Sequence, residues 1–468
     1  MSYGIHWFRR DLRVAGNVAL QKQFKKHDGR VVGIFCFDKK FLARDDFSVN
    51  RFQFFLETLR ELKKELRAIG SDLLLMDVGP DQAFKLLFEQ MNKTGVDLPS
   101  TISWSRDYEP FAVERDDRMK KFFDKMGVDN FDERDHLLIE PHELEKGKGE
   151  GYQVYSPFAR KWLSLYESDE IQARVKLYKK GFTYLRKLEK GDAEKVFKLT
   201  WKKLFNGKMD IEDHLDEYIR ENLKKVDVEI PPSGSVVAWK KILDFKKKID
   251  EYGDKRDFPQ LDGTSKLSMY LKNGSITVPQ IIAVFDLEPY QKKSSGRDVY
   301  LSELIWREFY YHILARFPNV EHESFLEKYR DLKWGNNKKW FEAWKEGKTG
   351  FPIVDAGMRE LKETGWMHNR VRMIVASFLT KDLLIDWKWG EKYFMDKLLD
   401  GDLAPNNGGW QWAASTGCDP QPYFRIFNPW LQSKKFDPDG VYIKKFVPEL
   451  ANEDPKNLHQ PIIGHHSY

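Results

Sequence analysis

The stretch Gly4-Ile-His-Trp-Phe-Arg-Arg-Asp-Leu-Arg13 places a short apolar segment directly before a cluster of charged residues. Three further short apolar segments follow at Val31–Phe37, Asp72–Met76 and Thr101–Ser105. Continuously apolar segments of this length are typical of strands that are buried on both faces of a parallel sheet. The sequence therefore predicts four short parallel strands near the N-terminus.

Segments with helical periodicity separate these strands. The periodicity is visible in Arg51–Ile69 and Pro80–Met91, and a helix is also expected in Glu109–Met126. Strands that alternate with helices form a parallel sheet covered on both faces, so this region is predicted to be an α/β, Rossmann-like domain. No G-x-G-x-x-G motif follows the first strand, where Arg9–Arg13 stands instead, so a dinucleotide is not expected on this sheet.

The rest of the chain follows a different pattern. The periodicity weakens after Arg134, and Arg174–Lys195 is densely charged, which is typical of a solvated connector. After Thr200 the strand pattern stops, and amphipathic helices are expected at Trp239–Tyr252, Leu301–Phe317 and Met358–Leu384. We therefore expect an α/β domain over residues 1–133, a connector over residues 134–199 and an all-helical domain over residues 200–468.

Length and composition limit the class of protein. A chain of 468 residues exceeds the usual size of one hydrophobic core, which agrees with two domains. The sequence shows no apolar run of the ~18 residues that a membrane span needs, and no signal peptide is visible. The two cysteines exclude a disulfide scaffold and fit a reducing cytoplasm. The net charge of +5 is compatible with nucleic-acid binding but does not require it.

The most distinctive stretch is Asp400-Gly-Asp-Leu-Ala-Pro-Asn-Asn-Gly-Gly-Trp-Gln-Trp-Ala-Ala-Ser-Thr-Gly417. Trp410 and Trp412 offer flat ring faces, the acids and amides offer hydrogen-bonding groups, and the glycine pair would let the backbone approach a ligand. Ten of the fifteen tryptophans lie between Trp306 and Trp430. A tryptophan-rich core would explain any single ring, but the accompanying polar residues favour a site for a flat heteroaromatic cofactor.

A second candidate segment contains hydroxyl groups. Thr264, Ser265 and Ser268 stand where a helix is expected to begin, and Lys266 adds a positive charge. Hydroxyls and free backbone N–H groups at a helix start can bind an anion, although they can also simply cap the helix.

Two helical faces each bring together three candidate side chains at spacings of three and four residues. They are Glu303, Trp306 and Arg307 on one face, and Asn369, Arg372 and Met373 on the other. The first set could equally be a surface salt bridge packed on a ring. His368 has no second His or Cys at ligand spacing, so no metal site is expected. Since no Ser-His-Asp arrangement or phosphate-binding loop is present, we expect a bound cofactor to perform the chemistry.

Three blocks resemble the photolyase/cryptochrome family: Asp262–Ser268, Gly365–Met373 and Asp400–Gly417. Together with Trp7–Arg13, the similarity spans nearly the whole chain in the family's order, and the motifs are long and specific. The resemblance implies an N-terminal antenna-binding domain and a helical C-terminal domain that holds FAD. It is closest to the class I photolyases, which repair cyclobutane pyrimidine dimers.

The resemblance also implies a flavin site. Asn406 would face flavin N5, the ion pair of Arg372 and Asp400 would lie against the flavin, and Asp402 would lie at its polar edge. Lys266 is a departure, because relatives often have Arg there. The full set of FAD-binding residues that the resemblance implies is Tyr252, Thr264, Ser265, Lys266, Leu267, Ser268, Arg307, Asn369, Arg372, Asp400, Asp402 and Asn406.

Further matches concern electron transfer and the substrate. Trp410, Trp387 and Trp334 match a chain of tryptophans that carries an electron from the surface to photoexcited flavin. In the substrate pocket, Trp306 and Trp412 match rings that flank the dimer, Glu303 matches a carboxyl group that bonds to it, and Asn369 and Met373 match pocket residues. The implied activity is that of a carbon–carbon lyase, namely light-driven repair of UV-damaged DNA by electron transfer from excited reduced FAD.

Two alternatives remain within the family. A cryptochrome would bind FAD and signal without repair, although only a short segment follows Leu450, where signalling members commonly carry a long extension. A (6-4) photolyase is disfavoured because that branch typically has a His at the Asn369 position. The resemblance implies a cytoplasmic monomer that acts on DNA without a membrane.

The antenna site is the last implication. Six residues resemble the pattern of relatives that bind a deazaflavin: Cys36, Asp38, Arg51, Asp107, Glu109 and Lys272. Phe111 and Ala112 stand where folate-binding relatives often have polar residues, so methenyltetrahydrofolate is the alternative chromophore. A domain interface around an empty cleft would give a similar set of residues.

Overall fold

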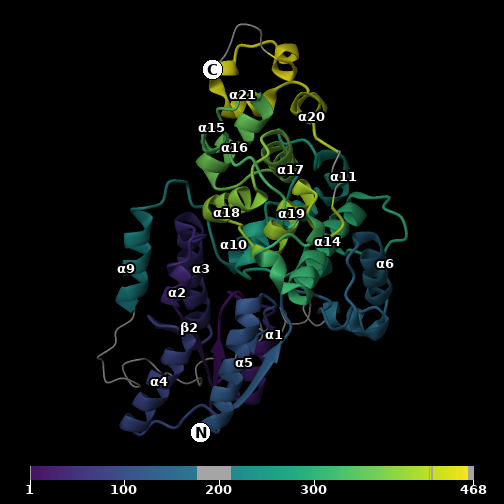
Figure 1. Cartoon of the computed structure of the whole chain (residues 1–468). Coiled ribbons are helices and arrows are strands. Elements are labelled where there is room, and N and C mark those ends of the chain that lie inside the picture. Colours follow the sequence, from purple (N-terminus) through teal and green to yellow (C-terminus); the bar gives the residue numbers. More distant parts are fainter. Residues whose placement is uncertain (1, 177–211, 421, 423–424, 462–468) are drawn as a thin grey trace.

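The computed structural model describes residues 2–176, 212–420, 422 and 425–461 (Figure 1). Most of the charged segment Arg174–Lys195 and the boundary expected at residue 199 lie outside the described residues. Within those residues, no helix combines the length and the hydropathy that crossing a membrane requires.

The N-terminal half contains a five-stranded parallel sheet in the order β3-β2-β1-β4-β5. This is the order of a Rossmann-like sheet, so the predicted fold class is confirmed for this half. The strands are β1 (Gly4–Trp7), β2 (Val31–Cys36), β3 (Leu73–Met76), β4 (Thr101–Ser105) and β5 (Asp129–Glu133).

Helices cover both faces of the sheet, because alternate strand residues point to opposite sides. Val32 and Ile34 pack with α4 (Pro80–Thr94) and α5 (Pro110–Lys125). Phe35 packs on the other face, where α1 (Val18–Lys26), α3 (Val49–Ala68) and α9 (Glu212–Leu223) contribute. In Figure 1 this half lies at the bottom of the view, and α9 lies beside α3. A short helix, α2 (Lys39–Leu42), follows β2.

The sequence did not reveal β5 or α1. The strand β5 is an edge strand of sequence DNFDE whose residues are exposed or partly buried, so it lacks an apolar run. The helix α1 begins after Asn17, whose side chain accepts a hydrogen bond from the backbone N–H of Leu20 and caps the helix. The sequence identifies such a cap only if the start of the helix is already known.

The C-terminal half is helical, as predicted, and packs around two apolar clusters. The first cluster includes α6 from the region expected to be a connector, and α14 runs through it. The helices are α6 (Tyr155–Tyr166), α10 (Ser235–Lys246), α11 (Tyr252–Lys255), α12 (Ser268–Lys272), α13 (Val278–Phe285), α14 (Gly296–Arg316), α15 (Lys338–Lys345), α16 (Pro352–Thr364), α17 (Asn369–Ser377), α18 (Trp387–Lys397), α19 (Leu403–Ala414), α20 (Pro429–Phe436) and α21 (Val441–Phe446).

The single helix expected over Met358–Leu384 is wrong. The helix α16 ends at Gly365, which has a φ of 65°, and α17 begins after His368, whose side chain accepts a bond from the backbone N–H of Arg370. A π-helical segment, η6 (Phe378–Asp382), follows directly. A left-handed glycine ends a helix because it has no Cβ to oppose that conformation.

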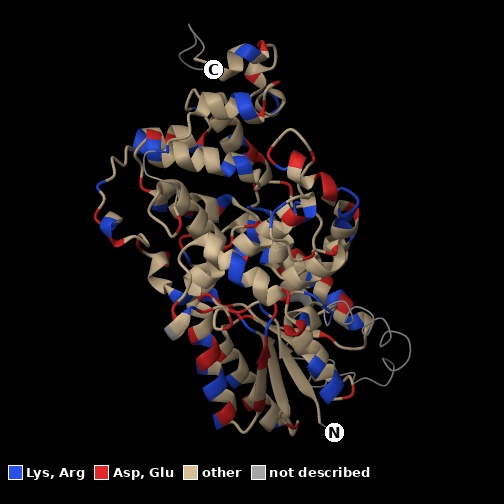
Figure 2. Cartoon of the chain, turned by 90° about the vertical axis from the view of Figure 1, so that its right-hand side faces the viewer, with Lys and Arg blue, Asp and Glu red and all other residues tan. Residues whose placement is uncertain are grey.

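The segment Arg9–Arg13 connects the two halves. Arg13 donates to the backbone carbonyl of Gly274 at 3.0 Å and forms a buried ion pair with Asp135. Gly274 has a φ of 73°, and a Cβ there would lie 1.9 Å from the carbonyl oxygen of Arg10. The two halves are therefore in backbone contact, and Figure 2 shows acidic and basic residues interspersed along this junction.

Candidate functional site

A cavity of about 420 Å³ opens in the helical half between α14, α17, α18 and α19. It brings together most of the side chains that the sequence singled out for flavin and substrate. Those that line it are Glu303, Trp306, Arg307, Asn369, Arg372, Met373, Asp400, Asp402, Asn406, Trp410 and Trp412. A cavity of this size, in which charged and amide side chains lie beside aromatic rings, suits a flat cofactor with polar edges.

The two glycines at the centre of the 400–417 block have different roles. A Cβ on Gly408 would lie 2.0 Å from the ring of Tyr310, so this glycine allows α19 to pack closely on α14. Gly409 lines the cavity and has open space where its Cβ would stand. Only Gly409 therefore fits the expectation that the backbone comes close to a ligand.

Asn406 is oriented by the neighbouring helix α18. Its Nδ2 donates to the backbone carbonyl of Glu391 at 3.1 Å. Because a carbonyl can only accept, this bond fixes which way the amide lies, and Oδ1 is the atom that an N–H donor in the cavity would meet. Glu391 also accepts from Nδ2 of Asn407 at 3.0 Å, while burial raises the pKa of Glu391 to about 7.

Arg372 and Asp400 form the ion pair that the resemblance implied. Nη2 of Arg372 lies 2.8 Å from one oxygen of Asp400, and Nε donates to the backbone carbonyl of Met367 at 2.8 Å. The carboxylate of Asp400 is buried, so removing either partner would leave an uncompensated charge against the cavity.

Asp402 is the most strongly compensated acid of the site. It accepts from Tyr311 at 2.7 Å, pairs with Lys272 at 2.9 Å and Arg10 at 3.2 Å, and lies 3.7 Å from Arg307. Burial alone would raise the pKa of Asp402, but the three positive charges outweigh it and hold that pKa far below its usual range. Asp402 is therefore ionised at every physiological pH.

Two lining contacts had not been expected from the sequence. Glu303 pairs with Arg256, and Trp306 stacks on Tyr155 with ring centroids 3.6 Å apart and planes 4° from parallel. Arg256 stands four residues after Tyr252, so helical spacing offered a signal for it. Tyr155 gave no signal, because α6 lies in the region that the sequence presented as a connector.

The hydroxyl-rich segment that was expected to bind an anion does not line this cavity. The expectation that Thr264 and Ser265 lie in the first helical turn is wrong, because α12 begins only at Ser268. Residues 264–267 lie before that helix and are not helical, and Lys266 there has a φ of 50°. The hydroxyl of Ser265 bonds to that of Tyr300 at 2.9 Å, and the rings of Tyr300 and Tyr252 lie 4.9 Å apart.

Of the three tryptophans predicted to form a relay, only Trp410 lines the cavity, whereas Trp387 and Trp334 do not. Trp410 lines the cavity and is 2% exposed, Trp387 is 1% exposed and Trp334 is partly exposed. All three belong to the second apolar cluster or pack against it. Among the three tryptophans, Trp334 is therefore the most exposed, as expected for the outer member of the series.

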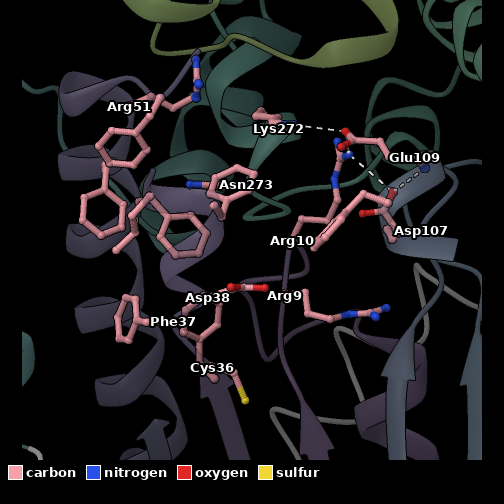
Figure 3. A pocket seen from close by; sticks show the side chains of 18 of the residues that line it. Arg9, Arg10, Cys36, Phe37, Asp38, Arg51, Asp107, Glu109, Lys272 and Asn273 are labelled. Carbon is pink, nitrogen blue, oxygen red and sulfur yellow. Dashed lines mark hydrogen bonds and ion pairs between the residues drawn. The ribbon is translucent and has the colours of Figure 1, made fainter. Parts of the chain in front are cut away.

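A second cavity of about 220 Å³ lies where the two halves meet (Figure 3). Phenylalanine rings from β2 and α3 form much of its wall. All six predicted antenna residues line it: Cys36, Asp38, Arg51, Asp107, Glu109 and Lys272. Lys272 lies 3.4 Å from Glu109, and Arg10 lies 2.8 Å from Glu109 and 3.6 Å from Asp107.

Arg51 is engaged away from the centre of the second cavity. Its guanidinium donates to the backbone carbonyls of Leu398 at 3.1 Å, Asp46 at 3.2 Å and Met395. In Figure 3 the side chain points up, towards the ribbon of the helical half. Arg51 thus holds the C-terminal end of α18, while its aliphatic part faces the cavity.

Comparisons with known proteins agree with this geometry. A family model described as DNA photolyase matches residues 4–176, and the FAD binding domain of DNA photolyase matches residues 300–467. The deoxyribodipyrimidine photo-lyase of Vibrio cholerae is 39% identical and covers 97% of this chain and 92% of its own. That of Escherichia coli is 34% identical, with 98% and 92% covered.

Solved structures give the same result. A bacterial class III photolyase from Agrobacterium tumefaciens has a TM-score of 0.78 and 34% identity over 98% of this chain and 89% of its own. An archaeal photolyase from Sulfolobus tokodaii, solved with two FAD molecules, has a TM-score of 0.75 and 31% identity over 97% and 92%. Fold and site thus define a two-domain flavoprotein of the photolyase type. The chain belongs to the DNA photolyase family.

Proposed function

We propose that this chain repairs cyclobutane pyrimidine dimers in UV-damaged DNA, using light and reduced FAD. The observation that carries the proposal is a single cavity lined both by the flavin-type polar groups and by the dimer-type rings. When bound in its reduced form, FAD supplies the light absorption and the one electron that opens the dimer, and it takes that electron back.

On the flavin side, the residues bind and orient. Oδ1 of Asn406 is held so that it can accept from an N–H group at the centre of the ring system. The pair of Arg372 and Asp400 provides a flat, neutral surface for the isoalloxazine. We place the FAD phosphates near Tyr252 and the segment Thr264–Ser268, where Lys266 offers a positive charge, with Asn369 near the adenine.

On the substrate side, Trp306 and Trp412 offer ring faces to a lesion turned out of the duplex, as is general for enzymes that act on bases. Glu303 would exchange its bond to Arg256 for one to the dimer and stabilise the dimer radical anion. Met373 and Asn369 complete the pocket and favour the class I assignment, while the class III photolyase of similar structure fits the same function.

The deciding experiment is light-dependent repair of DNA with a single thymine dimer by chemically reduced protein. The proposal expects restoration in blue light and none in the dark. DNA with a (6-4) photoproduct is the control substrate, and its repair would favour that branch instead. Normal photoreduction of FAD without repair of either lesion would favour a cryptochrome.

We further propose that Trp410, Trp387 and Trp334 relay electrons inwards. In this relay Trp410 would be the electron donor to the flavin, and Trp387 and then Trp334 would refill the hole in turn. Trp334, which is partly exposed, would be left oxidised, and a thiol in the solvent would return one electron to it. Photoreduction should therefore be lost in Trp334→Phe, while repair by protein reduced beforehand should remain.

We propose that the second cavity holds a flat antenna chromophore of the deazaflavin type, with methenyltetrahydrofolate as the alternative. Its phenylalanine wall suits an extended ring, and Asp38, Lys272 and Glu109 offer edge contacts. The archaeal relative with a second FAD is an example of another flat occupant. The absorption spectrum of the purified protein distinguishes these chromophores, and flavin bands alone would contradict both.

We also propose the domain division at residues 133 and 199 and a monomeric, cytoplasmic protein. Limited proteolysis would locate the connector, and light scattering coupled to gel filtration would measure the mass against the 55.4 kDa of one chain.

A further inference from the structure

Helix α18 carries the middle ring of the tryptophan relay and contacts the elements that carry the other two. Trp387 is its first residue, and Asp386 is its N-cap. The inner ring, Trp410, belongs to α19, which packs against α18, and the outer ring, Trp334, lies on the loop before α15. The spacing of the three rings therefore depends on how α19 and that loop are attached to α18.

The inner attachment is at Gly390, about one turn after Trp387. A Cβ at this position would lie 2.1 Å from Cη2 and 2.4 Å from Cζ3 of Trp410, and 2.7 Å from Cδ2 of Leu379. Real Cβ atoms do not approach other atoms so closely, so the six-membered ring of Trp410 rests on the bare backbone of α18. Side chains, first that of Trp410 and then that of Leu379, require glycine here, since the backbone of Gly390 is ordinary helix and has no positive φ.

The outer attachment is a pair of loops joined by hydrogen bonds. The backbone N–H of Gly335 donates to the carbonyl of Leu384 at 2.7 Å, and Oδ1 of Asn336 accepts from the backbone N–H of Asp386 at 2.9 Å. Gly335 directly follows Trp334, and Asp386 directly precedes Trp387. The Asn336 bond is thus a short link between the outer and the middle ring.

Both loops adopt unfavourable backbone conformations at this contact. Asn336 has a φ of 47° and Leu384 a φ of 52°. Residues other than glycine adopt the left-handed region at a cost, and asparagine tolerates it best. The hydrogen bonds between the loops offset this cost, so loss of the Asn336 acceptor would favour separation of the loops.

We propose that Asn336 and Gly390 are positioning residues of the tryptophan relay, which fix its outer and inner gaps. This inference rests on the relay proposed above. Electron transfer between two rings becomes steeply slower as the gap widens, so small displacements at either attachment would reduce the yield of photoreduction. Neither residue contacts the cavity that holds the proposed dimer site.

The outer gap is tested with two variants at one position. Asn336→Gly removes the acceptor without backbone strain, and Asn336→Asp keeps an acceptor oxygen. Loss of one hydrogen bond corresponds to about fivefold more frequent opening of the loops. We expect hydrogen exchange at the Asp386 amide to become about fivefold faster in Asn336→Gly, and photoreduction of oxidised FAD in the presence of a thiol to fall, with both restored in Asn336→Asp.

Transient absorption measures the lifetime of the tryptophan radical, which would not change if Asn336 had only a structural role. In Asn336→Gly the tryptophan radical should stop at the buried Trp387 and be lost by recombination from there. In the wild type it should move on to the partly exposed Trp334. Unchanged exchange at Asp386, or a wild-type radical lifetime, would overturn the role of Asn336. A loss of FAD content equal in the Gly and Asp variants would also overturn it.

The inner gap is tested by a double-mutant cycle that needs no flavin signal. Gly390→Ala should lower the melting temperature in the wild-type background, and should do so less together with Trp410→Phe, which removes the two nearest crowding atoms and leaves the contact with Leu379. Equal losses in the two backgrounds would overturn the role of Gly390.

Failure of the relay itself would look different. Trp334→Phe and Trp387→Phe are the reference variants for photoreduction. If neither lowers it, the proposed relay is wrong. If both abolish it while Asn336→Gly does not, the relay stands and the positioning role falls.

Discussion

Trp306 connects the larger cavity to the surrounding fold. One face lies on Tyr155 of α6, and the side chain also lines the cavity. A ring that is stacked on one side is pre-oriented for a second flat partner on the other, because little side-chain freedom remains to be lost on binding.

The first residue-level prediction concerns recognition of the lesion. Trp306→Ala should weaken binding to dimer-containing DNA about tenfold or more, since stacking of a base on an aromatic ring is worth about 1–3 kcal/mol. Binding to undamaged duplex, which depends on phosphate contacts, should hardly change. Binding titrations on the two DNAs measure the difference, and Trp306→Phe is the matched control. Equal losses on both DNAs would refute the assignment.

The second prediction concerns acid sensitivity. Burial lowers the pKa of His312 from 6.5 to about 4, and its Nε2 donates to the carbonyl of Ile139 at 3.0 Å. The unfolded chain therefore binds a proton at higher pH than the folded chain does, so stability is lost as pH falls from 6.5 towards 4. At pH 5 the loss from this group is about 2 kcal/mol.

The corresponding variant is His312→Gln, which can keep the bond to Ile139 without titrating. The difference in unfolding free energy between pH 7 and pH 5 should be smaller in the variant than in the wild type by about that 2 kcal/mol. Denaturant unfolding at both pH values measures it. An identical pH dependence of the two proteins would contradict a neutral buried His312.

At the residue scale, sequence motifs could predict which side chains share the main cavity where the motifs are contiguous. Asp400, Asp402 and Asn406 lie in one block, so local chain geometry brings them together. Tyr155 could not be found in the same way, and neither could the partner of Arg256, because the contacts with Trp306 and Glu303 depend on helix packing between distant parts of the chain.

At the scale of elements, the break between α16 and α17 is the feature that could not be predicted from the sequence. Apolar residues continue with helical period across it, so periodicity alone predicted one long helix. The break allows His368 to cap α17, which therefore begins at Asn369 on the cavity wall. If one straight helix ran through this point, Asn369 and Arg372 would not lie at their present positions on the cavity wall.

This break leads to a prediction with a built-in control. Gly365→Ala should destabilise the protein by more than the roughly 1–2 kcal/mol of a left-handed alanine, because its Cβ would also lie 2.9 Å from Leu399. Gly350→Ala has a similar φ of 80° but open space around it, so it measures the backbone cost alone. Thermal unfolding compares the two, and equal shifts would show that the contact with Leu399 is unimportant. FAD content should fall only in Gly365→Ala.

The parallel strands could be predicted because each is apolar throughout, whereas the polar edge strand β5 could not. The start of α14 was placed too late for a related reason. Ser295 and Asp298 form a capping box, which begins the helix at Gly296, ahead of its first apolar turn.

At the scale of the whole molecule, Asp402 joins the two cavities. It lines the larger cavity, while its partners Lys272 and Arg10 line the smaller one. The two cavities therefore share a wall of paired charges between the α/β and helical halves.

This wall predicts an asymmetric response to substitution. Asp402→Asn leaves Lys272, Arg10 and Arg307 without their shared anion and should cost about 3–5 kcal/mol of unfolding free energy. Lys272→Met leaves Asp402 with two remaining cations and should cost less. In the double variant the two costs should not add, because one removes the repulsion that the other creates. Denaturant unfolding of the four proteins tests this, and simple additivity would argue against the shared wall.

The backbone contact between Gly274 and Arg10 has a consequence for protein engineering. Exchanging the α/β half for that of a relative is one way to introduce a chromophore that absorbs at another wavelength. Here the boundary runs through a contact that tolerates no added atom and through charges that balance only across it. A grafted half would have to bring its own counterparts of Arg10 and Arg13 together with the receiving loop around Gly274. A working chimaera therefore requires exchange of the contact residues on both sides of the boundary as well as exchange of the domain.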